Sequence, residues 1–193
     1  MSEQRRLAGD RELRVTVDTP GADRAVVACP PHPRMGGTRS DPRLRAVGEA
    51  LSDRSVACLR FDYGPWDEGE GERRDALTVV ASASDDYDAV ALFGYSFGAG
   101  VALLAAAESE PSAVSVLAPP ASLGGADTVA ALDALSCPVQ VAVGERDSTV
   151  DWEPVAERAR EHEATVESVP GDHFFAGQND RIGESVAGFL SGE

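Results

Sequence analysis

The sequence contains no lysine, and its 17 basic residues are all arginines. Aspartate and glutamate together number 33, so the formal net charge is −16 at pH 7. A surface of this charge repels the phosphates of nucleic acids and the headgroups of anionic lipids. The composition therefore argues against nucleic acids and membranes as partners.

Long apolar runs are also missing, because none approaches the roughly 18 residues that cross a bilayer. The N-terminal Met-Ser-Glu-Gln-Arg-Arg has no apolar core of the kind that signal peptides carry. We therefore expect a soluble, cytoplasmic protein. The length of 193 residues suits one domain, which we expect to cover residues 1–193.

Cysteine is scarce, and Cys29, Cys58 and Cys137 each lie in an apolar, strand-like stretch. None of them has the spacing of metal ligands, so buried free thiols in a reducing cytosol are expected. We predict that the protein uses no metal and no cofactor. The sequence gives no indication of the oligomeric state.

The order of apolar and polar residues predicts strands that alternate with helices. Residues 11–18 have the alternation of a half-exposed antiparallel edge strand. Helices between short apolar strands require right-handed crossovers, which give a mainly parallel sheet covered on both faces. The stretch 117–136 is too short for a helical cap domain, so we predict an α/β fold with an open site. The expected strands are residues 24–29, 55–61, 89–93, 113–117, 138–143 and 165–169, and the expected helices are 41–54, 72–84, 99–107, 126–135, 152–162 and 181–190.

The stretch Gly94-Tyr95-Ser96-Phe97-Gly98 is the centre of the candidate site. A serine at the tip of a tight strand-to-helix turn sits in strained backbone, and flanking glycines let the neighbouring chains pass closely. The helix that follows directs free N–H groups at the same point. Ser96 is therefore the candidate nucleophile, and the Phe97 N–H is an expected oxyanion donor.

A serine hydroxyl needs a base within hydrogen-bond reach, and that base needs an orienting acid. His162 lies on a charged helix face and His32 lies between two prolines, whereas His173 follows the last expected strand at the carboxyl edge of the sheet. We take His173 as the base. Asp147, which follows strand 138–143 at the same edge, is the preferred acid. The rival acids are Glu145, Asp151 and Asp172.

The second oxyanion donor should be a backbone N–H in the loop after strand 24–29. Pro31 and Pro33 have no N–H, which leaves His32, Arg34 or Met35, with His32 preferred and Arg34 next. Four aromatic residues near these loops are candidate walls of a substrate pocket, although each is equally compatible with ordinary packing. They are Tyr63, Trp66, Tyr95 and Phe174.

The order Ser96, Asp147, His173 along the chain resembles that of the alpha/beta-hydrolase superfamily. Further motifs are similar to those of small, lidless prokaryotic members related to dienelactone hydrolases, although Pro30 stands where such proteins often have a first histidine. Dienelactone hydrolases use a cysteine nucleophile, so Ser96 argues against a lactone substrate. The resemblance implies the alpha/beta-hydrolase fold without a cap domain. The similar motifs are residues 31–38, 59–62, 68–72 and 171–175.

We predict a serine hydrolase that cleaves a small acyl ester or thioester through an acyl-enzyme. The acyl group should be small, because no lid supplies a long apolar trough. One alternative is a non-catalytic ligand-binding or scaffold protein on the same fold, since a fold does not fix a function. Another is an acyltransferase that uses the same three side chains.

The acidic, lysine-free composition is similar to that of proteins from halophiles that accumulate salt. Repulsion among the acids opposes the compact state in dilute buffer, whereas at 1 M salt the Debye length falls to about 3 Å. We predict that dialysis into low salt unfolds or inactivates the protein, as followed by circular dichroism and activity. Full stability in dilute buffer would reject this prediction.

Overall fold

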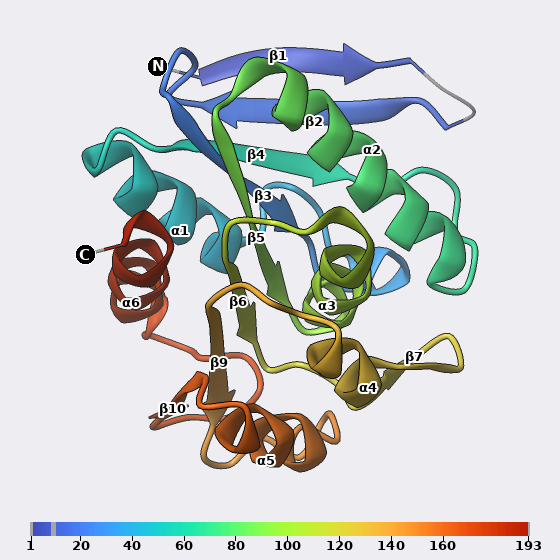
Figure 1. The fold of residues 1–193 in the computed structure, drawn as a ribbon, viewed down its shortest axis with the longest axis vertical. Coiled ribbons are helices and arrows are strands. Elements are labelled where there is room, and N and C mark those ends of the chain that lie inside the picture. The colour runs from blue at the N-terminus through green and yellow to red at the C-terminus, as the bar shows by residue number, and fades with distance from the viewer. Residues whose placement is uncertain (1, 9–10, 193) are drawn as a thin grey trace.

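The computed structural model describes residues 2–8 and 11–192, and its main feature is an eight-stranded sheet between two layers of helices (Figure 1). The strand order is β1-β2-β4-β3-β5-β6-β9-β10. β2 pairs antiparallel with β1 and β4, and the other neighbouring strands pair parallel. The strands of this sheet are β1 Ser2–Leu7, β2 Leu13–Asp18, β3 Arg24–Cys29, β4 Ala57–Asp62, β5 Ala89–Tyr95, β6 Val114–Leu117, β9 Val139–Gly144 and β10 Thr165–Val169.

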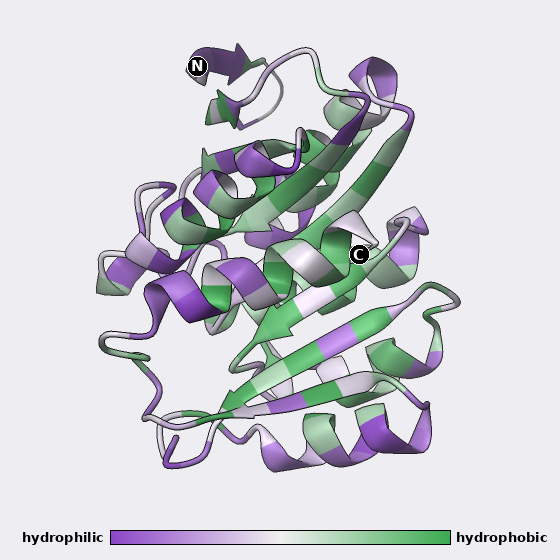
Figure 2. Ribbon diagram, turned by 90° about the vertical axis from the view of Figure 1, so that its left-hand side faces the viewer, coloured by the Kyte–Doolittle hydropathy of each residue, from purple (hydrophilic) through white to green (hydrophobic). Residues whose placement is uncertain are grey.

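The helices divide between the two faces of the sheet. Along β3, Ala25 and Val27 belong to a core cluster that includes residues of α2, α3, α4 and α5, whereas Val26 and Ala28 belong to a second cluster that includes residues of α1 and α6. Figure 2 shows the apolar strands between helices whose outer faces are hydrophilic. The helices are α1 Pro42–Asp53, α2 Glu70–Asp86, α3 Phe97–Ser109, α4 Thr128–Asp133, α5 Glu153–Glu161 and α6 Asn179–Ser191.

The alternation of strands and helices and the mainly parallel sheet agree with the sequence-based prediction. The expected edge strand is β2, but it is not outermost, because β1 pairs with it and forms the edge. The sequence does not predict β1, because its residues are mostly polar and their side chains are largely exposed. Backbone pairing with β2, rather than side-chain burial, holds this strand in place. Helix α3 begins at Phe97 instead of residue 99.

The connection from β6 to β9 is short. It contains the two-stranded pair β7 (Ser122–Leu123) and β8 (Ala126–Asp127) and the single short helix α4, where a longer helix over 126–135 was expected. No helical cap lies in this connection, so the carboxyl edge of the parallel strands is open there. In the described residues, no helix combines the length and apolar character needed to cross a membrane.

Two glycines of α6 provide a test of the packing between α1 and α6. A Cβ at Gly183 would lie 2.7 Å from the backbone oxygen of Ala46 in α1, whereas a Cβ at Gly188 would meet nothing within 4 Å. We predict that Gly183→Ala destabilises the protein by about 1–3 kcal/mol through overpacking. Gly188→Ala, the matched control, should stabilise it by about 0.5–1 kcal/mol because alanine favours helices. Chemical denaturation measures both, and equal effects would contradict the close packing.

Candidate active site

Ser96 lies at the turn between β5 and α3, in the backbone conformation φ 57°, ψ −122°. Its N–H donates to Leu117 O at 2.8 Å. A Cβ on Gly94 would lie 2.1 Å from Gly98 O, and a Cβ on Gly98 would lie 2.2 Å from Cys29 O. Both glycines are therefore required by the close approach of backbones, as the G-x-S-x-G pattern predicts.

The structure brings Ser96, His173 and Asp147 into one hydrogen-bonded chain. Ser96 Oγ lies 2.8 Å from His173 Nε2, and His173 Nδ1 lies 2.8 Å from Asp147 Oδ2. His173 is 5% exposed and Asp147 is 8% exposed, so water competes little for either contact. Asp147 Oδ1 also accepts from the Thr149 N–H at 2.8 Å, which fixes the carboxylate plane.

The three rival acids do not contact the histidine ring. Glu145, Asp151 and Asp172 are exposed, and Asp172 Oδ1 instead accepts from the Phe174 N–H. His162 is bonded to Asp133 on the surface, far along the chain from the turn. The geometry thus selects the same three side chains that the sequence favoured.

The loop after β3 contains fewer free N–H groups than the sequence suggested. The Arg34 N–H donates to His32 Nδ1 at 3.2 Å, and the Met35 N–H donates to His32 O at 3.0 Å. The prediction of Arg34 as an alternative oxyanion donor is therefore corrected, because this N–H is already used inside the loop. Within the described residues, the N–H groups of His32 and Phe97 have no such partner, so these two remain the candidate donors.

The His32 ring packs in a cluster of aromatic rings with Trp66 and Phe97, so the two residues that carry the candidate donors are in contact. Its centroid lies 4.6 Å from the Trp66 ring in a stacked arrangement and 4.9 Å from the tilted Phe97 ring. Burial and the nearby Arg34 guanidinium lower the pKa of His32, so the ring stays neutral near pH 7 and its Nδ1 can accept. The loop carrying His32 is thus packed directly against the residue that follows Ser96.

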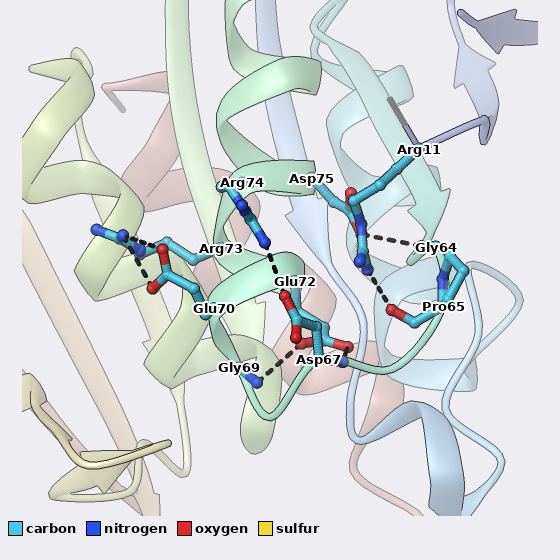
Figure 3. A network of polar contacts seen from close by, with 10 residues as sticks. All are labelled: Arg11, Gly64, Pro65, Asp67, Gly69, Glu70, Glu72, Arg73, Arg74 and Asp75. Carbon is cyan, nitrogen blue, oxygen red and sulfur yellow. Dashed lines mark hydrogen bonds and ion pairs between the residues drawn. The ribbon is translucent and has the colours of Figure 1, made fainter. Parts of the chain in front are cut away.

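A network of polar contacts ties residues 64–69, the loop before α2, to the first turns of that helix (Figure 3). Trp66 lies in this loop. Glu72, which is 0% exposed, accepts from the N–H groups of Asp67 at 3.0 Å and Gly69 at 2.8 Å. Asp75, one turn further along the helix, accepts from Arg11 Nε at 2.7 Å. The loop that carries Trp66 is therefore anchored from within the protein rather than free to close over the site.

A second anchor holds the loop that carries His173. The Tyr95 hydroxyl donates to His173 O at 3.0 Å, and burial raises the pKa of Tyr95 to about 12, which keeps this donor protonated. The Arg43 guanidinium lies 4.5 Å from the centre of the Tyr95 ring and donates to Phe174 O at 3.3 Å. Two consecutive carbonyl groups of the histidine loop are thus fixed by side chains of β5 and α1.

Ser96 and His173 open into a cleft of about 870 Å³. Trp66, Tyr95 and Phe174 line it, as expected, but Tyr63 does not. The Tyr63 ring packs against Phe97, and its hydroxyl donates to Pro30 O, so this residue supports the wall from behind. Other apolar lining residues, which the sequence did not single out for the pocket, are Pro31, Met35, Pro120, Leu123 and Val150.

The fold and the Ser-His-Asp arrangement define the class of α/β proteins with a serine-centred site at the carboxyl edge of a parallel sheet. Residues 35–188 match the family model described as "Alpha/beta hydrolase domain". Because the match covers most of the chain, this protein belongs to the alpha/beta hydrolase family. No curated protein matches the sequence.

Solved structures agree with this membership. An alpha-beta serine hydrolase homologue from Coxiella burnetii is 25% identical, with a TM-score of 0.82 and 97% coverage of both chains. An α/β serine hydrolase without lid from Xanthomonas campestris is 28% identical, with a TM-score of 0.80 and coverage of 99% of this chain and 92% of that one. A Pyrococcus furiosus esterase, 17% identical, shares the fold, with a TM-score of 0.84 over 98% of this chain and 90% of that one.

The buried carboxylate of Glu72 gives a test of the network behind Trp66. Glu72→Gln replaces one of two acceptor oxygens with an amide donor that faces an N–H, and we expect a loss of about 2 kcal/mol in unfolding free energy. Ser96 should also react more slowly with a fluorophosphonate, because the wall of the His32 loop loosens. Glu70→Gln is the matched control: it removes the same charge from the same helix turn but lies in an exposed pair with Arg73, worth at most about 0.5 kcal/mol. Similar effects of the two substitutions would contradict this role of Glu72.

Proposed function

We infer that this member of the alpha/beta hydrolase family is a serine hydrolase that cleaves an ester or thioester through an acyl-enzyme. The observation that carries the proposal is the chain of 2.8 Å contacts from Ser96 Oγ through His173 to Asp147 Oδ2. A hydroxyl, an imidazole and a carboxylate in this order supply a nucleophile, a general base and an orienting acid.

The first half of the reaction, acylation of Ser96, depends on proton transfer between Ser96, His173 and the leaving group. His173 Nε2 takes the proton of Ser96 Oγ while the oxygen attacks the acyl carbonyl, and Asp147 stabilises the imidazolium that forms. The N–H groups of Phe97 and His32 donate to the negative oxygen, and the helix dipole of α3 favours charge at the same point. His173 then gives its proton to the leaving oxygen, and the alcohol or thiol departs.

Hydrolysis of the acyl-enzyme repeats these steps with water as the nucleophile. His173 takes a proton from water, the hydroxide attacks the acyl group, and the proton returns to Ser96 Oγ as the carboxylic acid leaves. An alcohol or thiol in place of water would make the protein an acyltransferase with the same residues. The connection between β6 and β9 holds no helical cap that would shield the acyl-enzyme from water, which favours water as the acceptor.

The similar structures support this class of reaction. The one from Coxiella burnetii is described as a serine hydrolase homologue, the one from Xanthomonas campestris as a serine hydrolase without lid, and the one from Pyrococcus furiosus as an esterase. We propose a small acyl group, since no lid extends the cleft. The narrower relation to dienelactone hydrolases, a salt-rich cytoplasm as the setting, and the absence of nucleic acid or membrane partners stay predictions from the sequence.

Three substitutions test the proposal at molar salt with p-nitrophenyl acetate. Ser96→Ala and His173→Ala should each lower kcat by several orders of magnitude, because they remove the nucleophile and the base. Asp147→Asn should lower kcat by roughly 10⁴-fold, because the imidazole of His173 loses its correct tautomer and orientation. A fluorophosphonate should label the native protein and leave Ser96→Ala unlabelled. Turnover that survives in Ser96→Ala would overturn the proposal. A native protein that neither reacts with the probe nor hydrolyses esters would instead support a non-catalytic, ligand-binding role.

A further inference from the structure

Two large apolar side chains are exposed among the described residues, and both border the same cleft. They are Met35, which is 82% exposed, and Phe174, which is 59% exposed. The chain as a whole is strongly acidic, with a formal net charge of −16. Exposed apolar side chains that gather at one place usually mark a surface that binds something apolar.

The exposure of Phe174 is built into the backbone. Its N–H donates to Asp172 Oδ1 at 3.0 Å, and its carbonyl oxygen accepts from Arg43 at 3.3 Å. The next residue, Phe175, is fully buried and has φ 50°, a left-handed conformation that costs a bulky residue energy. The chain thus turns one phenylalanine into the core and holds its neighbour at the cleft.

The position of Phe174 relative to His173 determines which half of a substrate it can contact. The two rings are perpendicular, with centroids 5.5 Å apart. In the proposed reaction, the leaving oxygen must come within hydrogen-bond distance of His173 Nε2 to receive its proton. The group attached to that oxygen then lies in the cleft that His173 and Phe174 both line, whereas the carbonyl oxygen points to the N–H groups of Phe97 and His32.

We propose that Phe174 binds the alcohol half of the substrate, and that the preferred substrates are esters of small acids with aromatic or bulky apolar alcohols. This inference rests on the proposed function and deepens it by naming the substrate class. The charges beside Phe174 do not favour an ionic group there, because Arg43 is paired with Asp41 at 2.6 Å. An aromatic alcohol instead covers apolar surface that the free protein leaves in water.

The test compares two ester series at molar salt. In the first, the acid is acetate and the alcohol grows from methanol through phenol to 1-naphthol. In the second, the alcohol is methanol and the acid grows from acetate through butyrate to benzoate. Each result is the ratio of kcat/KM for native protein and variant on the same ester, so the intrinsic reactivity of the ester cancels.

Phe174→Ala should lower kcat/KM for 1-naphthyl acetate about tenfold more than for methyl acetate, which corresponds to about 1.4 kcal/mol. Along the acid series, the same variant should change kcat/KM for all esters by a common factor. Phe174→Tyr, which keeps the ring, should retain the preference for the naphthyl ester. Truncation of an exposed side chain leaves no cavity, and circular dichroism with fluorophosphonate labelling checks that the variant is folded with a reactive Ser96.

The outcomes separate the inference from the function on which it rests. The inference alone is wrong in two cases in which the native protein hydrolyses the esters. In one, Phe174→Ala lowers kcat/KM for all esters by the same factor, and in the other, its effect on kcat/KM varies along the acid series instead of the alcohol series. If the native protein hydrolyses none of them, the proposed function fails and the inference falls with it.

Discussion

Ser96 keeps a backbone conformation, φ 57° and ψ −122°, that ordinarily costs a residue with a side chain roughly 1–3 kcal/mol. The surrounding structure holds it there through the bond from its N–H to Leu117 O and through glycines at 94 and 98 that let three backbones meet. The same turn begins α3, so the bend that lifts the serine hydroxyl also places the Phe97 N–H beside it. The nucleophile and one oxyanion donor therefore depend on a single piece of strained backbone, and neither can be adjusted without the other.

The second oxyanion candidate depends on residues far from the serine in sequence. Glu72 and Asp75 are buried carboxylates, which are costly unless fully hydrogen-bonded. Here Glu72 accepts from two loop N–H groups and Asp75 pairs with Arg11 (Figure 3). Because these bonds fix the loop that carries Trp66, and Trp66 stacks on His32, the buried acids contribute to the shape of the site without touching it. An apolar residue in place of Glu72 would leave the N–H groups of Asp67 and Gly69 without this acceptor.

The parallel strands and the Ser-His-Asp arrangement could be predicted because both depend on local signals, namely apolar runs, the glycines around Ser96 and the small number of histidines. Features that depend on contacts across the fold could not. The burial of Glu72 contradicts the usual exposure of charged residues. The sequence also does not show that His32 Nδ1 accepts a hydrogen bond from the Arg34 N–H. Tyr63 was misplaced because the direction of a side chain just beyond a strand end depends on the neighbour against which it packs, here Phe97. β1 was missed because pairing of exposed polar residues leaves no periodic pattern.

The net charge of −16 and the contacts at the candidate site act over different distances. A negative charge on the reacting oxygen is disfavoured by the field of so many acids, but salt shortens the reach of that field to about 10 Å at 0.1 M and 3 Å at 1 M. Hydrogen bonds from the Phe97 and His32 N–H groups would act at about 3 Å, which leaves no room for salt ions between donor and oxygen, so screening affects them little. A neutral ester also carries no charge for the surface to repel before Ser96 attacks it. An acidic surface and a reaction that builds up an oxyanion are therefore compatible, provided that the stabilising dipoles are close and the substrate arrives uncharged.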